Sequence, residues 1–105
     1  MRVHKHPQAK RDIIEQAAYI ARDNPDVALQ FVAALEEALE RLAHMPHIGS
    51  LYETAHSPLD GMRSWRIRSF EQHLIFYAAH EDRIEIIRVL HAKRDIEAVL
   101  YDPHP

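Results

Sequence analysis

The sequence predicts a single α+β domain in which a helical hairpin packs on a small, mainly antiparallel sheet. Two amphipathic helical patterns lie in the first half of the chain, and three strand patterns with short joins lie in the second half. The chain has 105 residues, the size of one compact domain, so we assign residues 1–105 to one unit. The expected order is β-α-α-β-β-β, followed by a short C-terminal helix.

The expected first strand covers residues 2–6, and the first helix follows it up to about Asp23. Pro7 suits the first turn of a helix, because its fixed φ angle is helical and its missing N–H is not needed there. Apolar residues recur at spacings of three and four along this stretch, which predicts one apolar stripe. The stripe contains Ile13, Ala17 and Ile20, with Ile14, Ala18 and Ala21 beside them.

The second helix is expected to start after Asn24 and to end near His44. Asn24 is a good N-cap because the residue before a proline is held out of the helical region, and Pro25 suits the first helical position. Two amphipathic helices with so short a join form an antiparallel hairpin. The apolar stripe of the second helix consists of Ala28, Phe31, Val32, Leu35, Ala38, Leu39 and Leu42.

A long loop is predicted between the hairpin and the sheet. Pro46 ends the second helix and Gly49 permits a turn, while residues 50–61 contain two further breakers, Pro58 and Gly61. A loop of this length is uncommon in a small domain, so we expect part of it to be ordered or functional.

Three strands are expected after the loop, in the stretches "MRSWRIRS", "HLIFYAA" and "RIEIIRVLH". The first alternates between two faces, whereas the other two are apolar on nearly both faces. Their short joins predict an antiparallel meander. Because the hairpin can cover only one face of the sheet, the other face is predicted to be an exposed apolar surface for a partner. The alternative is that the loop or a C-terminal helix in "RDIEAVLYD" covers it.

Charge and composition exclude several classes of function. The net charge of −3 disfavours generic nucleic-acid binding, which needs a basic surface. The chain has no cysteine, too few glycines for a phosphate-binding loop and no serine in a nucleophile elbow. His4 and His6 share a strand face but lack a third ligand, so we expect no metal site and no cofactor. The polar N-terminus and the lack of a long apolar run predict a cytoplasmic protein without membrane contact.

An acid–base site for RNA cleavage is one hypothesis. Such a site needs a base, an acid and cations around a phosphate, and the candidates are His91, Tyr77, Arg66, Arg68, Arg88 and Arg94. Arg88 and His91 are three positions apart, so on a regular strand they point to opposite faces. The favoured interpretation places Tyr77 in the core and makes His91 the end of its strand, with Asp95 as a cap for the next helix. Trp65 is expected in the core, with Arg63 on the same face.

Several motifs, taken together, resemble one protein family. They are "RD" near the start of the first helix, "YIA" with "DNP", "P-x-x-G" after the second helix, "GMR-x-W", "LIFY" and "IIRVLHAKRD". In this order they cover nearly the whole chain, and "RVLHAKRD" after "LIFY" at this spacing is the specific part. The pattern resembles the RelE/ParE superfamily of bacterial type II toxins, and it is closer to the ParE branch.

The resemblance implies the β-α-α-β-β-β fold and a toxin that a small antitoxin wraps with its C-terminal segment. The ParE branch implies inhibition of DNA gyrase without catalysis, whereas RelE-type relatives cut mRNA on the ribosome. Three lysines and a net negative charge favour the ParE branch. His91 keeps the nuclease as the alternative, and a third hypothesis is a degenerate toxin that acts only as an antitoxin-bound co-repressor.

These hypotheses define the candidate residues. For antitoxin contact we expect Arg63, Trp65, Ile67, Phe31 and Leu35. For contact with the target we expect Arg66, Arg68, His91, Lys93 and Arg94. A gyrase inhibitor needs no catalytic residue, whereas the alternative nuclease would use His91, Tyr77 and Arg88. The expected partners are a cognate small antitoxin in a hetero-oligomer and DNA gyrase, with DNA contacted only through the antitoxin.

Overall fold

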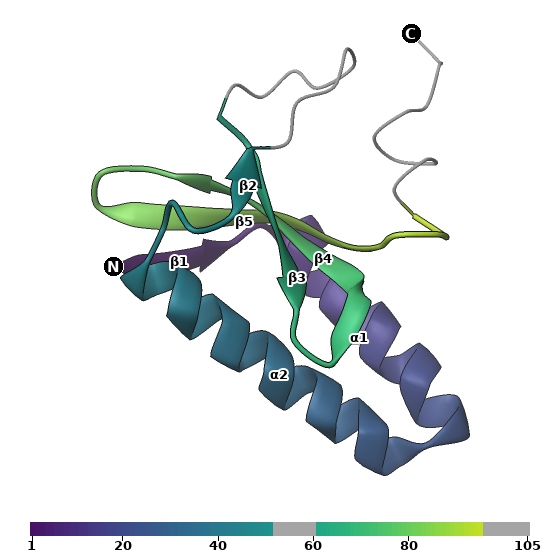
Figure 1. Ribbon diagram of the computed structural model, residues 1–105. Helices are drawn as coiled ribbons and strands as arrows, with labels where there is room; N and C mark the ends of the chain where they lie inside the picture. The colour runs from purple at the N-terminus through teal and green to yellow at the C-terminus, as the bar shows by residue number, and fades with distance from the viewer. Residues whose placement is uncertain (52–60, 96–105) are drawn as a thin grey trace, which may run out of the picture.

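The computed structural model describes residues 1–51 and 61–95. Its regular elements are β1 (Arg2–Lys5), α1 (Pro7–Asp23), α2 (Pro25–His44), β2 (Ser50–Leu51), β3 (Arg63–Ile67), β4 (Phe70–Ala79) and β5 (Arg83–His91). Figure 1 shows the two helices together on one side of a twisted sheet, which confirms the predicted α+β fold. Most of the expected C-terminal helix falls on residues 96–105, outside the described residues. No helix among the described residues combines the length and apolar character needed to cross a bilayer.

The sheet has five strands in the order β1-β5-β4-β3-β2. β1 runs parallel to β5, and every other neighbouring pair is antiparallel, so the predicted meander of β3, β4 and β5 is confirmed. β2 lies in the stretch that the sequence predicts as a loop. Its two residues pair only with Arg63 and Ser64, and so short a strand has no periodicity to detect.

The helical hairpin turns at Asn24, as predicted. The side-chain oxygen of Asn24 accepts hydrogen bonds from the backbone N–H groups of Asp26 and Val27, at 3.1 and 3.2 Å. These N–H groups lie in the first turn of α2 and have no partner within the helix, so the cap satisfies them. Pro25 occupies the start of α2, and α2 then runs back along α1 (Figure 1).

The buried face of α1 differs in part from the predicted stripe. Half of the stripe packs against the core, namely Ile13, Ala17 and Ile20. Ile14, in contrast, is 68% exposed, while the polar side chains of Asp12 and Gln16 are buried. These two side chains lie against β5 beyond the end of β1, because β1 pairs only with residues 83–86.

The main core lies between the hairpin and one face of the sheet. Its fully buried members come from both layers and include Phe31, Leu35, Leu42, Ile67, Ile75, Tyr77, Ile84, Ile86 and Val89. The stripe predicted for α2 is confirmed apart from Val32, which is 37% exposed. Burying one large apolar side chain contributes about 1.5–3 kcal/mol, so this layer holds the hairpin on the sheet.

The opposite face of the sheet carries a second, smaller core cluster. Its members, Met62, Leu74, Phe76 and Leu90, are between 0 and 7% exposed. The prediction of an exposed apolar surface is therefore wrong for these four side chains. Their burial stabilises the fold, because apolar surface is removed from water. The segments considered as their cover fall largely on residues 52–60 and 96–105, outside the described residues.

A register shift in β5 changes which of its side chains share a face. The pairing with β4 shifts between Ile86 and Arg88, so Ile87 is an extra residue in β5. As a result, Ile86 and Val89 both pack in the main core although they are three positions apart. A β-bulge of this kind breaks the two-residue alternation from which the faces of a strand are predicted.

Candidate partner-binding surfaces

Tyr77, a candidate nuclease residue, is fully buried and holds the loop after α2. Its hydroxyl donates a hydrogen bond to the carbonyl oxygen of Pro46 and accepts one from the N–H of Gly49, both at 2.9 Å. Burial raises the pKa of the Tyr77 phenol, so the hydroxyl stays protonated. The prediction that Tyr77 is a core residue is confirmed. A hydroxyl with a donor and an acceptor already in place is poorly suited to act on a phosphate.

Arg63, the leading candidate for antitoxin contact, is tied to the same loop. Its guanidinium donates hydrogen bonds to the carbonyl oxygens of His47 and Gly49, at 3.2 and 2.8 Å. Arg63 and Tyr77 therefore both hold the backbone of Gly49. The "P-x-x-G" and "GMR" motifs meet in space here, and a structural role accounts for their residues.

Arg88, the second candidate nuclease residue, forms a two-point ion pair with Asp12 of α1. Its Nε and Nη2 lie 2.8 and 3.0 Å from the two carboxylate oxygens. The same carboxylate accepts a hydrogen bond from the N–H of Val89 at 3.0 Å, and Asp12 is only 4% exposed. The "RD" and "IIRVLH" motifs thus meet at the edge of β5, where Arg88 fastens α1 to the sheet.

Gln16 and His73 extend this polar network into the core. Nε2 of Gln16 donates to the carbonyl oxygen of Val89 at 2.5 Å, and Oε1 of Gln16 accepts a hydrogen bond from Nδ1 of His73. Because an amide oxygen only accepts, Nδ1 of His73 carries the proton. Burial, together with the nearby His91 and Arg94, lowers the pKa of His73 to about 4, so the ring is neutral at physiological pH.

We expect the fold to lose stability below pH 6.5 because of His73. The imidazole has its ordinary pKa of 6.5 in the unfolded chain but a pKa of about 4 in the fold. Between these values the unfolded chain binds more protons, so the free energy of unfolding decreases as the pH falls. At about 1.4 kcal/mol per pH unit, the loss approaches about 3 kcal/mol by pH 4. Denaturant unfolding at a series of pH values measures it.

His73→Gln is the matched variant for this pH series. Its amide can donate to Gln16 but does not titrate, so its stability should fall less between pH 6.5 and pH 4. The same pH slope in both proteins would show that His73 does not cause the loss.

His91 closes β5 and organises the residues that follow. Its Nδ1 accepts hydrogen bonds from the backbone N–H groups of Lys93 and Arg94, at 3.2 and 3.4 Å. The carboxylate of Asp95 accepts the N–H of His91 at 2.9 Å, so Asp95 caps this junction. Burial and the nearby Arg94 lower the pKa of His91, which favours the neutral ring, and the two backbone donors favour the tautomer in which Nδ1 has no proton. The prediction that His91 ends the last strand is confirmed.

Of the three candidate nuclease residues, Tyr77 lies apart from the other two, whereas Arg88 and the turn after His91 border one cavity of about 290 Å³, lined among others by Asp12, Arg94 and Asp95. Tyr77 lies in the main core beside the loop after α2, and Arg88 lies at the edge of β5 against α1. His91 lies at the end of β5, with its ring centroid 5.1 Å from that of His73. Each of the three has an intramolecular hydrogen-bond partner.

The other residues expected at the antitoxin interface lie in or beside the main core. Phe31, Leu35 and Ile67 have no exposed surface, so they offer a partner no contact area in this conformation. Trp65 is partly exposed and packs against the margin of the core. An apolar stripe predicts burial equally in a core or in an interface, so the sequence alone cannot separate these two roles.

The residues expected at the target surface fall into two groups. Arg66 and Arg68 are exposed at the end of β3, two strands away from β5. His91, Lys93 and Arg94 lie together at the end of β5, where the Arg94 guanidinium sits over the ring of Tyr19, 4.5 Å from its centroid. The two groups are therefore separate candidate surfaces.

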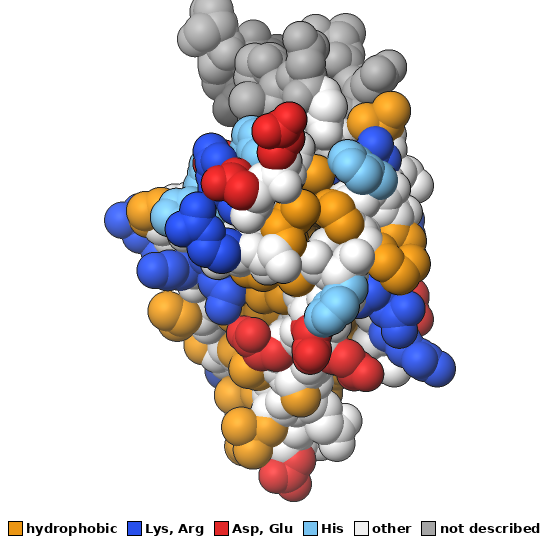
Figure 2. Space-filling view, turned by 90° about the vertical axis from the view of Figure 1, so that its left-hand side faces the viewer, with side chains coloured by type: hydrophobic (Ala, Val, Ile, Leu, Met, Phe, Trp, Pro, Cys, Tyr) orange, Lys and Arg blue, Asp and Glu red, His pale blue; other side chains and the backbone are white. Residues whose placement is uncertain are grey.

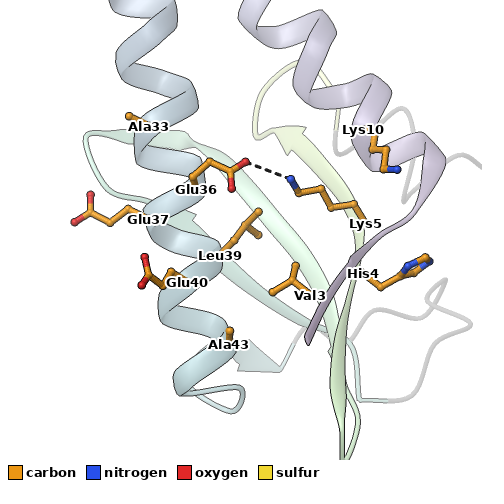
Figure 3. Close-up of a pocket in the computed structure, with 10 residues that line it drawn as sticks. All are labelled: Val3, His4, Lys5, Lys10, Ala33, Glu36, Glu37, Leu39, Glu40 and Ala43. Carbon is orange, nitrogen blue, oxygen red and sulfur yellow. Dashed lines mark hydrogen bonds and ion pairs between the residues drawn. The ribbon is translucent and has the colours of Figure 1, made fainter. Parts of the chain in front are cut away.

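A groove of about 850 Å³ lies between β1 and α2 (Figure 3). Its lining includes the apolar residues Val3, Ala33, Leu39 and Ala43. Lys5 and Glu36 form an ion pair across it at 3.2 Å, and further charges on its rim come from Lys10, Glu37 and Glu40. β1 is an edge strand with β5 as its single neighbour, so the groove combines apolar surface with an open strand edge.

Charge is mixed on the face of the molecule that Figure 2 shows. Figure 2 shows acidic side chains in a row across the lower middle of one face, with Lys and Arg gathered to either side. This face lacks the continuous basic stripe that is typical of a protein binding nucleic acid through phosphates.

Histidines gather near β1 without forming a metal site among the described residues. The rings of His4 and His6 are 5.8 Å apart, and His6 and His80 each approach Oε2 of Glu85, at 3.4 and 3.6 Å. Within residues 1–51 and 61–95, no three His, Asp or Glu side chains are placed to hold a metal ion.

The buried polar residues Asp12, Gln16 and His73 were not predicted as a network. One signal was present in the sequence: Asp12 and Gln16 are four positions apart and interrupt the inner stripe of α1. Two polar side chains at that spacing lie on one face of a helix, so they indicate a polar contact within the buried face.

Comparisons with known proteins agree with this architecture. A family model described as "ParE toxin of type II toxin-antitoxin system, parDE" matches residues 3–96. The structure is similar to a chain of the chromosomal ParDE TA system from P. aeruginosa, with a TM-score of 0.65 and 17% identity over 89% of this chain and 97% of that one. It is also similar to a chain of the YoeB-YefM complex from Staphylococcus aureus, with a TM-score of 0.51 and 23% identity over 87% and 95% of the two chains. At these identities the two structures show a shared fold alone. No curated protein matches the chain.

Proposed function

The chain belongs to the ParE toxin family of type II toxin–antitoxin systems, and we propose that it inhibits DNA gyrase without catalysing a reaction. The observation that carries this proposal is that each of the three candidate nuclease residues is already engaged in a hydrogen bond within the fold. Tyr77 is bonded to the loop after α2, Arg88 to Asp12, and His91 to the turn that follows β5. The net charge of −3 and the mixed charge on the face in Figure 2 also favour a protein target over a phosphate backbone.

A gyrase assay tests this proposal directly. Purified toxin should inhibit supercoiling of relaxed plasmid by gyrase or trap cleaved DNA, and addition of the cognate antitoxin should reverse the effect. Normal supercoiling at high toxin excess would count against gyrase as the target. A chain that causes no growth defect when expressed alone would instead fit the co-repressor alternative.

The RelE-type alternative rests on His91 and on the fold shared with the YoeB chain. It predicts mRNA cut in the ribosomal A site and loss of those cuts in His91→Ala. We expect ribosome-bound mRNA to stay intact with both proteins, because Tyr77 and Arg88, which would act with His91, are engaged within the fold. Primer extension on ribosome-bound mRNA is the measurement. Cuts that appear with wild-type toxin and vanish in His91→Ala would establish the nuclease.

We place the antitoxin in the groove between β1 and α2. Phe31, Leu35 and Ile67 are buried, so an incoming chain meets other residues first. In the groove, an extended segment could pair with the free edge of β1 and set apolar side chains against Val3 and Ala43. Its polar side chains would then face the charged rim.

Val3→Glu should weaken the toxin–antitoxin complex by about tenfold or more. Val3 is 37% exposed in the free toxin, so the carboxylate remains hydrated there, whereas an occupied groove would bury it without a partner. Isothermal titration calorimetry with the cognate antitoxin measures the change. Ile14→Glu on α1 is the control, because Ile14 is exposed and does not line the groove. Equal affinities for Val3→Glu and wild type would place the antitoxin elsewhere.

A further inference from the structure

The edge of β3 is only partly covered by its neighbour. β2 begins at Ser50, opposite Ser64, and runs antiparallel to β3 only as far as the pair of Leu51 and Arg63, while β3 continues beyond Ser64 to Ile67. Among the described residues, the stretch from Trp65 to Ile67 therefore has β4 on one side and no strand on the other. An uncovered strand edge presents backbone N–H and C=O groups that can pair with another chain.

Three arginines surround this edge. Arg66 and Arg68 lie at the end of β3, and Arg41 reaches the same place from α2. Nη1 of Arg66 donates to the carbonyl oxygen of Glu71 at 2.6 Å, which fixes the side chain without using a carboxylate. No ion pair joins any of the three to a carboxylate of the described residues, although other arginines of the chain form such pairs. The three guanidinium groups thus keep donors for a partner.

Two cavities meet at this edge. One, of about 310 Å³, lies toward α2 and is lined by Ala34, Ala38 and Arg41. The other, of about 540 Å³, is lined by Ser50, Ser64 and Leu74. Trp65, Arg66 and Arg68 line both, so side chains that alternate along an added strand would have a hollow on either side. Glu37 and Glu71 also line them, and the Glu71 carboxylate accepts the N–H of Ser69 at 3.1 Å.

These features fit an acidic peptide better than a nucleic acid. Guanidinium groups pair with carboxylates through two parallel hydrogen bonds, and the strand edge supplies backbone pairing that a nucleic acid cannot use. Trp65 packs against the main core, so its ring is not free to stack on a base. The net charge of −3 also disfavours a polyanion as long as a nucleic acid.

We propose that the edge of β3, flanked by Arg41, Arg66 and Arg68, binds an extended acidic segment of the protein that the toxin inhibits. The assignment rests on the proposed function, in that the target is a protein. It gives the two partners different strand edges, that of β1 for the antitoxin and that of β3 for the target, and the two surfaces adjoin on α2, where Glu37 lines both.

The first test uses a labelled peptide of alternating Glu and Val with the full-length toxin, measured by fluorescence anisotropy. Arg41→Glu/Arg68→Glu should weaken binding by at least about tenfold, since it removes two charge-assisted contacts. Arg11→Glu/Arg22→Glu on α1 changes the net charge equally and should have little effect. An N-methylated form of the same peptide should also bind weakly, because it cannot pair with a strand edge. Equal binding of a Lys–Val peptide or of single-stranded DNA, or no loss in Arg41→Glu/Arg68→Glu, would overturn the proposal.

The second test distinguishes this proposal from the gyrase proposal. Arg41→Glu/Arg68→Glu should lose gyrase inhibition and keep wild-type affinity for the antitoxin. If that variant inhibits gyrase as well as wild type does, the β3 edge is not the target surface and the gyrase proposal stands. If wild-type toxin leaves gyrase active but binds the acidic peptide through these arginines, the surface stands and gyrase is the wrong target.

Discussion

Asp12→Ala is expected to lower the free energy of unfolding by about 3–5 kcal/mol, the range for breaking a buried ion pair from one side. The carboxylate of Asp12 is almost fully buried and serves Arg88 through both oxygens and the N–H of Val89 through one. Without the carboxylate, the guanidinium of Arg88 loses its counter-charge although it is mostly shielded from water. The backbone N–H of Val89 also loses the acceptor that replaces a missing strand neighbour.

Denaturant unfolding of three variants separates these causes. Asp12→Asn keeps one acceptor oxygen and should lose less stability than Asp12→Ala. Adding Arg88→Leu to Asp12→Ala removes the unpaired charge and should restore part of the loss, which a double-mutant cycle measures. Asp23→Ala, at the exposed end of the same helix, is the control and should cost less than about 0.5 kcal/mol. A loss in Asp12→Ala as small as that in Asp23→Ala would contradict a structural role for the pair.

Asp12 also shows where prediction from the sequence ends. The turn at Asn24 was predictable because the cap, the proline and the helix start are adjacent in the chain. The end of β5 at His91 was also predictable from neighbouring residues, because the run of strand formers stops there. The partners of Asp12 lie 76 and 77 positions away, so the spacing of Asp12 and Gln16 in the helix could not identify them. The "RD" and "IIRVLH" motifs could be identified in the sequence, whereas the contact between them, from Asp12 to Arg88, depends on the whole fold.

The candidate surfaces were harder to predict than the elements that carry them. Phe31 and Val3 are both apolar, but one is fully buried while the other is partly exposed beside the groove. The open edge of β1 follows from the order of strands in the sheet, which requires β1 to pair with β5 across almost the whole chain, and the open part of the β3 edge follows from the shortness of β2. The extra residue at Ile87 shifts the faces of β5 as well. Such long-range pairings determine which arginines form hydrogen bonds within the fold, as Arg63 and Arg88 do. They also determine which arginines remain available to a partner.

Gly49→Ala should destabilise the protein by about 2–4 kcal/mol, because there is no room for a side chain at this position. A Cβ atom on Gly49 would lie 2.5 Å from the hydroxyl oxygen of Tyr77 and 2.8 Å from the carbonyl oxygen of Ser64. Neither neighbour moves easily, since the tyrosine is fully buried and the carbonyl belongs to the backbone of β3. The loop must shift instead, which breaks the hydrogen bonds from Gly49 to Tyr77 and from Arg63 to Gly49.

Gly61→Ala is the matched control for Gly49→Ala, because the two glycines are constrained differently. Gly61 has a φ of +77° with open space around its Cβ position, so alanine there costs only backbone strain of about 1 kcal/mol. Thermal and denaturant unfolding should therefore rank Gly49→Ala well below Gly61→Ala in stability.

The shift at Gly49 also reaches the neighbouring Ser50, which pairs with Ser64 at the start of β3. Gly49→Ala should thus weaken binding of the acidic peptide at the β3 edge as well, while a Gly61→Ala protein binds it normally. If Gly61→Ala were the less stable variant, the loop after α2 would be able to move without cost. The hydrogen bonds that Arg63 and Tyr77 make to this loop would then not support the β3 edge.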